Sequence, residues 1–474
     1  MIGHPRVLQE QLDPSQSEAI YTASLRILDA AGLAVSSREA CDVFDGAGAR
    51  IRSGRVMMPP DLVQRSLSLA PHRFSLEGRN PARTVELGGG NLLVSPGYGS
   101  PSVADARGRR RDATLSDFEH FATLAACSDC IDITGGLLVE PLDVPPPLRA
   151  LETTRVLLER SDKPFLGSVA GAEGARDSLL LARLVFGDLD ARPVMMGLVN
   201  VNSPLRLDDR MAAALLEYAR AGQAVLLTPG ILMGVTAPVT AAGALAQAVA
   251  ELLACVVLVE ATRPGAPVVV GTGGFGADLR TGGPGFGRPE NALGTILGAQ
   301  LARRLGLPFR CSGAVTGSRV PDCRSGSERM LTAMAAWTSG AHLCLQGAGT
   351  LDSINSMSFE QFAIDVEMWT SLRRLARRPE VDGESLAVDL VSSLPPDYLG
   401  SDHTVEHMAG ELAVLSLSTP KPYDEWLAEG APDVVTLASR QLAGGTGGAP
   451  PQPLDPACLR EIRRCVEARR RDLS

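Results

Sequence analysis

The amino-acid sequence predicts an α/β protein that folds as a closed (β/α)8 TIM barrel with an N-terminal helical cap and a C-terminal helical extension. Apolar runs such as 193–199 and 224–230 are each followed by a loop and a helical pattern. This is typical of strands that are buried on both faces and joined by helices. The unit recurs at intervals of 29 to 43 residues. The candidate strands begin near Leu92, Ile131, Pro164, Pro193, Ala224, Pro267, Pro308 and Ala341.

An open, doubly wound sheet is the competing architecture. That fold usually carries a glycine-rich phosphate turn directly between its first strand and its first helix. Here the first candidate strand runs into a Gly/Pro-rich loop that reaches Pro101 without entering a helix. The barrel is therefore the favoured interpretation.

The sequence pattern divides the chain into four parts. Residues 1–90 form the cap, with helices expected at 12–32, 36–46 and 59–70 and a hairpin around Ser53–Gly54. Asp13 or Ser15 is expected to cap the first of these helices. Residues 91–380 form the barrel and 381–442 the helical extension, while 443–474 form a flexible linker and a terminal helix.

Composition excludes several classes of protein. A net charge of −9 over 474 residues argues against a nucleic-acid binder. No uninterrupted apolar stretch is long enough to span a membrane. Lys163 precedes its strand and Lys421 lies outside the barrel, so neither is placed for Schiff-base chemistry. Nine scattered cysteines without a secretory signal favour a cytoplasmic location.

No metal site is expected. Cys127 and Cys130 form the only C-x-x-C pair, and no second pair stands at zinc-ribbon spacing. His403 and His407 are four residues apart, but Thr404 follows His403 where the H-E-x-x-H motif requires glutamate. A capped helix start is favoured for this segment. The glycine-rich loop 272–287 is interpreted as a mobile lid, or as backbone kept close to a flat ligand.

Four segments together resemble the trimethylamine methyltransferase superfamily, in its branch that lacks pyrrolysine and whose members demethylate glycine betaine. They are Val103–Asp117, Thr228–Thr240, Gln346–Asn355 with Asp365–Glu367, and Leu399–His407. The resemblance implies a barrel that passes a methyl group from a methylated amine to the cobalt of a separate corrinoid protein. A folate acceptor remains an alternative.

Two departures from the pattern of that superfamily narrow the expected substrate and the expected source of the corrinoid. Pyrrolysine-dependent members carry that residue in the region that corresponds to 313–328. In this sequence the region contains standard residues, such as Ser318 and Arg319. Trimethylamine is therefore in doubt as a substrate. The D-x-H-x-x-G corrinoid signature is absent, so the chain is expected to bind no cofactor itself and to receive the corrinoid on a partner.

A quaternary ammonium substrate suits this chemistry because its nitrogen has no lone pair and leaves as a neutral tertiary amine. Aromatic faces and a nearby carboxylate are the usual means of binding such a cation. Tyr98 and Phe275 are the preferred aromatic candidates, with Phe359 and Trp369 second. Glu367 could balance the cation, although surface exposure is the alternative interpretation for a helical carboxylate.

Three amides at strand ends complete the predicted site. Asn200, Asn202 and Gln346 could bind a substrate carboxylate or hydroxyl, or could instead satisfy loop backbone. Glu367 and Gln346 are assigned the catalytic roles, and the other six residues substrate binding. The expected protein is a homo-oligomeric methyltransferase acting on a betaine- or carnitine-like amine. A barrel that binds methylated amines without turnover is the rival of a different class.

Overall fold

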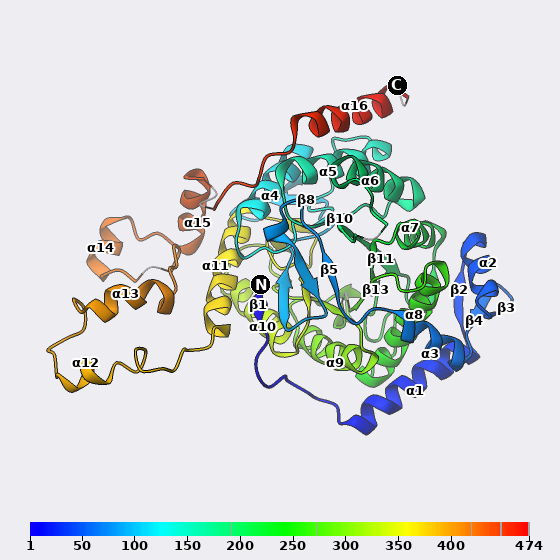
Figure 1. The fold of residues 1–474 in the computed structure, drawn as a ribbon, viewed down its shortest axis with the longest axis horizontal. Helices are drawn as coiled ribbons and strands as arrows, with labels where there is room; N and C mark the ends of the chain where they lie inside the picture. The colour runs from blue at the N-terminus through cyan, green and yellow to red at the C-terminus, as the bar shows by residue number, and fades with distance from the viewer. Residues whose placement is uncertain (191, 273, 419, 446–447, 473–474) are drawn as a thin grey trace.

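The computed structural model describes residues 1–190, 192–272, 274–418, 420–445 and 448–472, and its centre is one curled sheet surrounded by helices (Figure 1). The strand order is β1-β7-β18-β17-β14-β13-β11-β10, with every neighbouring pair parallel except β1 and β7. The strands are β1 (Ile2–Gly3), β7 (Asn91–Val94), β10 (Phe165–Gly167), β11 (Met195–Val201), β13 (Ala224–Pro229), β14 (Val268–Gly271), β17 (Phe309–Ser312) and β18 (Leu343–Leu345).

This order tests the two predicted architectures. From β10 to β18 the strands follow one another in sequence, and β18 then pairs with β7, the first of the parallel strands. A doubly wound sheet would instead reverse its order at a switch point. The mixed α/β fold is confirmed, and seven of the eight predicted strands begin within two residues of the expected position.

Eight helices cover the outside of the sheet (Figure 1). They are α4 (Leu115–Cys127), α5 (Pro146–Arg160), α6 (Gly171–Phe186), α7 (Asp209–Arg220), α8 (Ala241–Thr262), α9 (Pro289–Leu305), α10 (Cys323–Thr338) and α11 (Phe359–Ala376). Within the described ranges, α8 is the one helix long and apolar enough to cross a membrane. Its most apolar window is 89% buried in the protein, so α8 is a core helix.

Side chains alternate between the two faces of the sheet. Leu198 and Leu226 belong to the cluster that fills the inside of the sheet, whereas their neighbours Val199 and Leu227 belong to the larger cluster under the helices. The hairpin of β5 (Phe74–Leu76) and β6 (Val85–Leu87) adds apolar side chains to the inner cluster. The inside of the sheet is therefore a packed core and not an open channel.

The strand predicted at Ile131 is wrong. Residues 131–136 form no regular strand, although Asp132 N donates to Val94 O at 2.8 Å and Thr134 N donates to Pro164 O at 2.9 Å. Lys163 supplies a physical reason. Its buried ammonium donates to the carbonyls of Ala125, Ser128 and Ile131 at 2.7–2.8 Å, which draws the start of this segment out of a regular ladder.

The N-terminal part contains α1 (Pro14–Ala30), α2 (Arg38–Gly46) and α3 (Pro60–Leu69), as predicted. Asp13 is the cap of α1 and accepts from Gln16 N at 2.9 Å. The expected hairpin is confirmed as β3 (Arg50–Arg52) and β4 (Arg55–Met57), joined by a two-residue turn in which both residues have positive φ.

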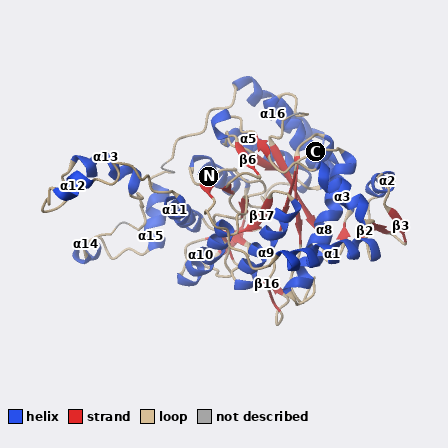
Figure 2. Ribbon diagram, turned by 60° about the horizontal axis from the view of Figure 1, so that its bottom comes forward, coloured by secondary structure: helices blue, strands red, loops and turns tan. Residues whose placement is uncertain are grey.

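After α11 the chain carries α12 (Val388–Ser392), α13 (Asp402–Glu411) and α14 (Tyr423–Ala428), which project from the body in both views (Figures 1 and 2). It then returns along α11 as α15 (Val434–Ala443) and ends in α16 (Pro456–Asp472), which contacts α5 and α6. Ser401 caps α13 by accepting from Thr404 N, so the capped helix start predicted for the His403–His407 segment is confirmed.

Candidate active site

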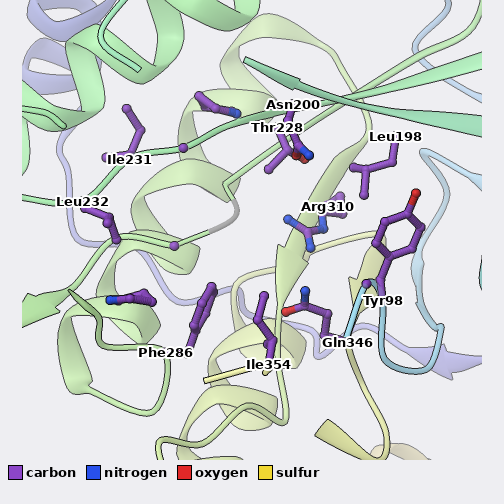
Figure 3. A pocket seen from close by; sticks show the side chains of 15 residues that line it. Tyr98, Leu198, Asn200, Thr228, Ile231, Leu232, Phe286, Arg310, Gln346 and Ile354 are labelled. Atoms are coloured by element: carbon purple, nitrogen blue, oxygen red, sulfur yellow. The ribbon is translucent and has the colours of Figure 1, made fainter. Parts of the chain in front are cut away.

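A cavity of about 410 Å³ opens at the carboxyl ends of β11, β13, β17 and β18 (Figure 3). Its wall is completed by the loops that follow β7 and β14. The carboxyl end of a parallel sheet is where active sites of α/β proteins collect. The volume suits a small organic molecule.

The position of the cavity follows from the alternation of side chains. Leu198 and Leu226 fill the inside of the sheet, and the next inward positions on the same strands are Asn200 and Thr228. The wall of the sheet thus changes from apolar to polar within one pleat. Asn200 and Thr228 lie opposite each other in the register of β11 and β13.

Arg310 is the inward residue of β17 and is only 2% exposed. Its Nη1 donates to Thr272 O at 3.2 Å, and Nε has no hydrogen-bond partner among the described residues. No described carboxylate forms an ion pair with it. Burial lowers the pKa of the Arg310 guanidinium to about 10, so it stays charged at neutral pH. An unpaired buried cation is costly unless a ligand neutralises it.

The sequence makes space for this side chain. A Cβ on Gly271, the neighbour of Arg310 in the sheet register, would lie 2.6 Å from the Arg310 carbonyl oxygen and 3.0 Å from its Cδ. Glycine at 271 therefore allows the arginine stem to cross the neighbouring strand.

Gln346 follows β18 in a left-handed conformation, with φ of 68°. Its backbone N donates to Pro96 O at 3.0 Å, and its side chain is 6% exposed. Within the described part of the chain, Gln346 Oε1 and Thr228 Oγ1 have no hydrogen-bond partner. In the view of Figure 3 the Arg310 and Gln346 side chains lie between the rings of Tyr98 and Phe286. Polar atoms without partners at one cavity indicate that a ligand binds them.

Two aromatic residues form opposite parts of the cavity wall. Tyr98 comes from the loop after β7, and a Cβ on Gly136 would lie 2.9 Å from its ring, so glycine is required beside it. Burial raises the pKa of the Tyr98 phenol to about 12, which keeps it neutral. Phe286 comes from the glycine-rich loop after β14. The cavity can therefore present aromatic faces to a cation at one place and a guanidinium to an anion at another.

The structure does not bring the other predicted aromatic residues to this cavity. Phe275 is 1% exposed, and its ring packs against Gly294 of α9. The Phe359 ring stacks on Phe121 at 4.1 Å between centroids. Trp369 is buried behind the cavity loop, where its Nε1 donates to Gly347 O at 2.6 Å.

Asn202 and Glu367 also lie elsewhere. Asn202 is exposed, lines a neighbouring hollow, and pairs with Arg206 through backbone hydrogen bonds. Glu367 faces away from the cavity and accepts from Leu417 N and Ser418 Oγ, both at 2.6 Å. This carboxylate anchors the C-terminal extension to α11.

Comparison with known proteins identifies the family. Residues 2–474 match the family described as Trimethylamine methyltransferase (MTTB). The chain belongs to this trimethylamine methyltransferase family. It is 36% identical over 423 residues to the glycine betaine methyltransferase of Desulfitobacterium hafniense, covering 88% of each chain. It is 29% identical to the L-carnitine:corrinoid methyltransferase of Eubacterium limosum, covering 77% of each.

A solved structure shares the fold of this trimethylamine methyltransferase family member. The monomethylamine methyltransferase of Methanosarcina barkeri superimposes with a TM-score of 0.52 at 12% identity. The match covers 94% of this chain and 96% of that one. At this identity the likeness establishes the fold alone.

Sequence reasoning missed several residues that line the cavity of this family member, among them Thr228, Phe286 and Arg310. Arg310 carried a signal, because an arginine inside an apolar strand that is buried on both faces needs a partner. Phe286 belongs to the loop 272–287, in which residue 273 lies outside the described residues. That loop contributes Gly274, Pro284 and Phe286 to the wall through the hairpin of β15 (Ala277–Asp278) and β16 (Gly283–Pro284), and its role as a lid stays a prediction.

Metal-ligating side chains gather elsewhere in this family member. Among the described residues, Glu384, Glu406 and His407 could together offer ligand atoms to an ion. They lie on the projecting segment around α13, and both glutamates are exposed. None of them lines the cavity.

Proposed function

We propose that this chain transfers a methyl group from a quaternary ammonium carboxylate, of the betaine or carnitine kind, to the corrinoid of a separate protein. The observation that carries the proposal is Arg310, a buried guanidinium at the wall of a small, largely apolar cavity, for which the described residues supply no carboxylate partner. The names of the relatives support it, since they are a glycine betaine methyltransferase and an L-carnitine:corrinoid methyltransferase.

Arg310 selects among methylated amines by charge. A bare cation such as trimethylammonium or choline would bring a second positive charge beside a guanidinium that is already unpaired. A zwitterion instead brings its own carboxylate. In the proposed pose the carboxylate accepts hydrogen bonds from Arg310, while the methylated nitrogen lies against the rings of Tyr98 and Phe286. Asn200 and the Gln346 amide can complete the polar contacts.

The residues of the cavity are proposed to act by positioning. A quaternary nitrogen has no lone pair and leaves as a neutral tertiary amine, so no general acid is required at that atom. The protein has to hold the N–CH3 bond in line with the acceptor and exclude water from it. The cobalt of the corrinoid supplies the nucleophile. A cavity of about 410 Å³ is too small to enclose a corrin ring, which fits delivery by a partner at the open end.

The backbone hydrogen bonds of residues 131–136 support a second proposal, which concerns the closure of the sheet. We propose that the sheet closes as a (β/α)8 barrel in which residues 131–136 occupy the second strand position, between β7 and β10. The backbone hydrogen bonds from this segment to Val94 and Pro164 support closure. We retain residues 91–380 as the barrel, between the cap and the extension.

Binding measurements on the wild type and Arg310→Met test the proposed substrate class. Calorimetry with glycine betaine, carnitine, choline and trimethylamine should show binding of the two carboxylates above that of the other two. Arg310→Met should weaken carboxylate binding by about a hundredfold, since a charge-assisted bidentate pair is worth about 3 kcal/mol. Binding of choline should not weaken. A melting curve identifies a variant that fails to fold, and Arg310→Lys then replaces it.

Turnover is tested by mixing the protein with cob(I)alamin and each amine and following the corrinoid spectrum. We expect methylation with a quaternary ammonium carboxylate and none with trimethylamine. Methylation driven by trimethylamine at a comparable rate would overturn the proposed substrate class. Tight binding of betaine with no transfer to any corrinoid would assign the chain to the passive binders instead.

A further inference from the structure

The segment 380–433, called the arm below, makes few contacts with the rest of the protein. It leaves the end of α11, carries α12, α13 and α14, and projects from the body in both views (Figures 1 and 2). Leu417 and Pro432 are the buried residues among those of the arm that the structure describes. Leu417 packs with Ala363 and Ala438, and Glu411 pairs with Arg374 of α11 at 2.7 Å, so these contacts fix the base of the arm.

The uncovered surface of the arm is rich in large apolar side chains. The arm holds fourteen of the twenty-eight large apolar side chains that are exposed in the described residues, although it is about a ninth of the chain. Val381 is 76% exposed, Leu399 85% and Val414 87%. Scattered exposed side chains are normal on a protein surface, but a concentration of this kind marks an interaction site.

The size of this surface matches a stable interface. Fourteen side chains that each expose on the order of 100 Å² offer on the order of 1,000 Å² of apolar area, against about 800 Å² per partner in a standard interface. Interfaces between permanently associated subunits are more apolar, whereas transient interfaces are more polar. The arm therefore fits a permanent partner.

The charge of the arm narrows the choice of partner. From Glu380 to Asp433 the sequence has twelve carboxylates and one basic residue, Lys421, a net charge of −11. The chain as a whole carries −9, so the remainder carries +2. An anionic membrane or a nucleic acid would be repelled, and so would a second arm lying directly against the first. The body of another copy of this chain has a small net positive charge, so it does not repel the arm as a whole.

We infer that the arm is the interface through which two copies of this chain associate, each arm lying on the body of the other. Such an exchange is reciprocal and closes with two-fold symmetry. The position of the arm argues against the corrinoid protein as its partner. α11 begins beside the cavity loop and ends at Ala376, about 25 Å farther along its axis, so the arm starts at the end remote from the cavity. This inference does not depend on the proposed substrate.

Sedimentation velocity of the full chain at micromolar concentration tests the inference. The wild type should sediment as a dimer or a larger assembly of dimers. The double substitution Leu399→Asp with Val414→Asp should raise the dissociation constant at least a hundredfold. Both side chains are at least 85% exposed in the single chain, so the substitution should leave the monomer folded. Val7→Asp is the matched control, because Val7 is 84% exposed but lies outside the arm, and it should change nothing.

Three results would overturn the inference. The wild type could remain a monomer at 10 μM, on the order of typical assay concentrations. The double variant could keep the assembly of the wild type while its circular dichroism shows a folded protein. The double variant could also keep its assembly but lose binding to a corrinoid protein, which would assign the arm to that partner.

Discussion

Arg329 of α10 and Asp365 of α11 form an ion pair of 2.8 Å in which both side chains are 1% exposed. Asp365 also accepts from Gly349 N at 2.7 Å, so the pair fixes the loop that carries Gln346 into the cavity. Burial raises the pKa of Asp365 to about 6 and lowers that of Arg329, so removal from water opposes both charges. Such a pair contributes more to a defined geometry than to net stability.

Asp365→Asn should therefore destabilise the protein strongly, because it leaves the Arg329 charge buried without a carboxylate partner. We expect a loss of about 3–5 kcal/mol in the free energy of unfolding. Urea denaturation at pH 7 measures it. The double variant Arg329→Met with Asp365→Leu removes both charges and should be more stable than Asp365→Asn. A single variant as stable as the wild type would contradict this account.

Glu260, near the end of α8, should make stability depend on pH. It accepts from Gly265 N at 2.7 Å, is 1% exposed, and has its pKa raised by burial to about 7 from an ordinary 4.5. The folded state thus holds this proton more tightly than the unfolded state does. The resulting stabilisation is complete below pH 4.5, declines as the pH rises towards 7, and is lost above about pH 7.

Glu260→Gln should remove this loss of stability between pH 4.5 and 7, since glutamine keeps an acceptor for Gly265 N and carries no charge. We expect the variant to exceed the wild type by about 1–2 kcal/mol at pH 8, after allowance for solvent screening, and to match it at pH 4.5. Denaturation curves at the two pH values decide the question. A difference of the same size at both would assign the effect to packing.

The two lysines of the chain offer a matched pair for testing the irregular segment 131–136. Lys163 donates three hydrogen bonds to buried carbonyls, whereas Lys421 pairs with Glu429 on the exposed arm. Lys163→Met should cost about 2–4 kcal/mol, because the three carbonyls lose a charged donor. Lys421→Met should cost under about 0.5 kcal/mol. Equal shifts in the melting temperature would refute the role assigned to Lys163.

Much of the fold could be read from the sequence because seven strands are continuous apolar runs at regular intervals. The eighth could not, since the hydrogen bonds of Lys163 to the chain near Ile131 are long-range contacts that leave no local periodicity. The same limit applies to the site. Tyr98, Asn200 and Gln346, which line the cavity, could be chosen because they follow or end strands, but no pattern could tell whether Phe275 or Phe286 faces the cavity.

These two phenylalanines give the next prediction. Phe286→Leu should weaken the binding of a quaternary ammonium carboxylate three- to tenfold, because it removes one aromatic face from the cavity wall while keeping apolar volume. Phe275→Leu should leave affinity unchanged and lower the melting temperature, because its ring fills the space above Gly294. Calorimetry and melting curves of the two variants separate these effects. If Phe275→Leu instead weakened binding and Phe286→Leu only lowered the melting temperature, the loop would have to adopt another arrangement when substrate binds.

Tyr98 decides where the methylated cation lies, and it can be dissected because burial keeps its phenol neutral, with a pKa of about 12. Tyr98→Leu removes the ring face but keeps much of the apolar volume. A desolvated cation–π contact is worth up to about 2 kcal/mol, so affinity should fall by about tenfold or more. Tyr98→Phe keeps the face and should cost less than about threefold. Calorimetry with the amine found to bind gives both values. If Tyr98→Phe loses as much affinity as Tyr98→Leu, the hydroxyl and not the ring face binds the substrate. A lower melting temperature for Leu with unchanged affinity would place the cation against Phe286 alone.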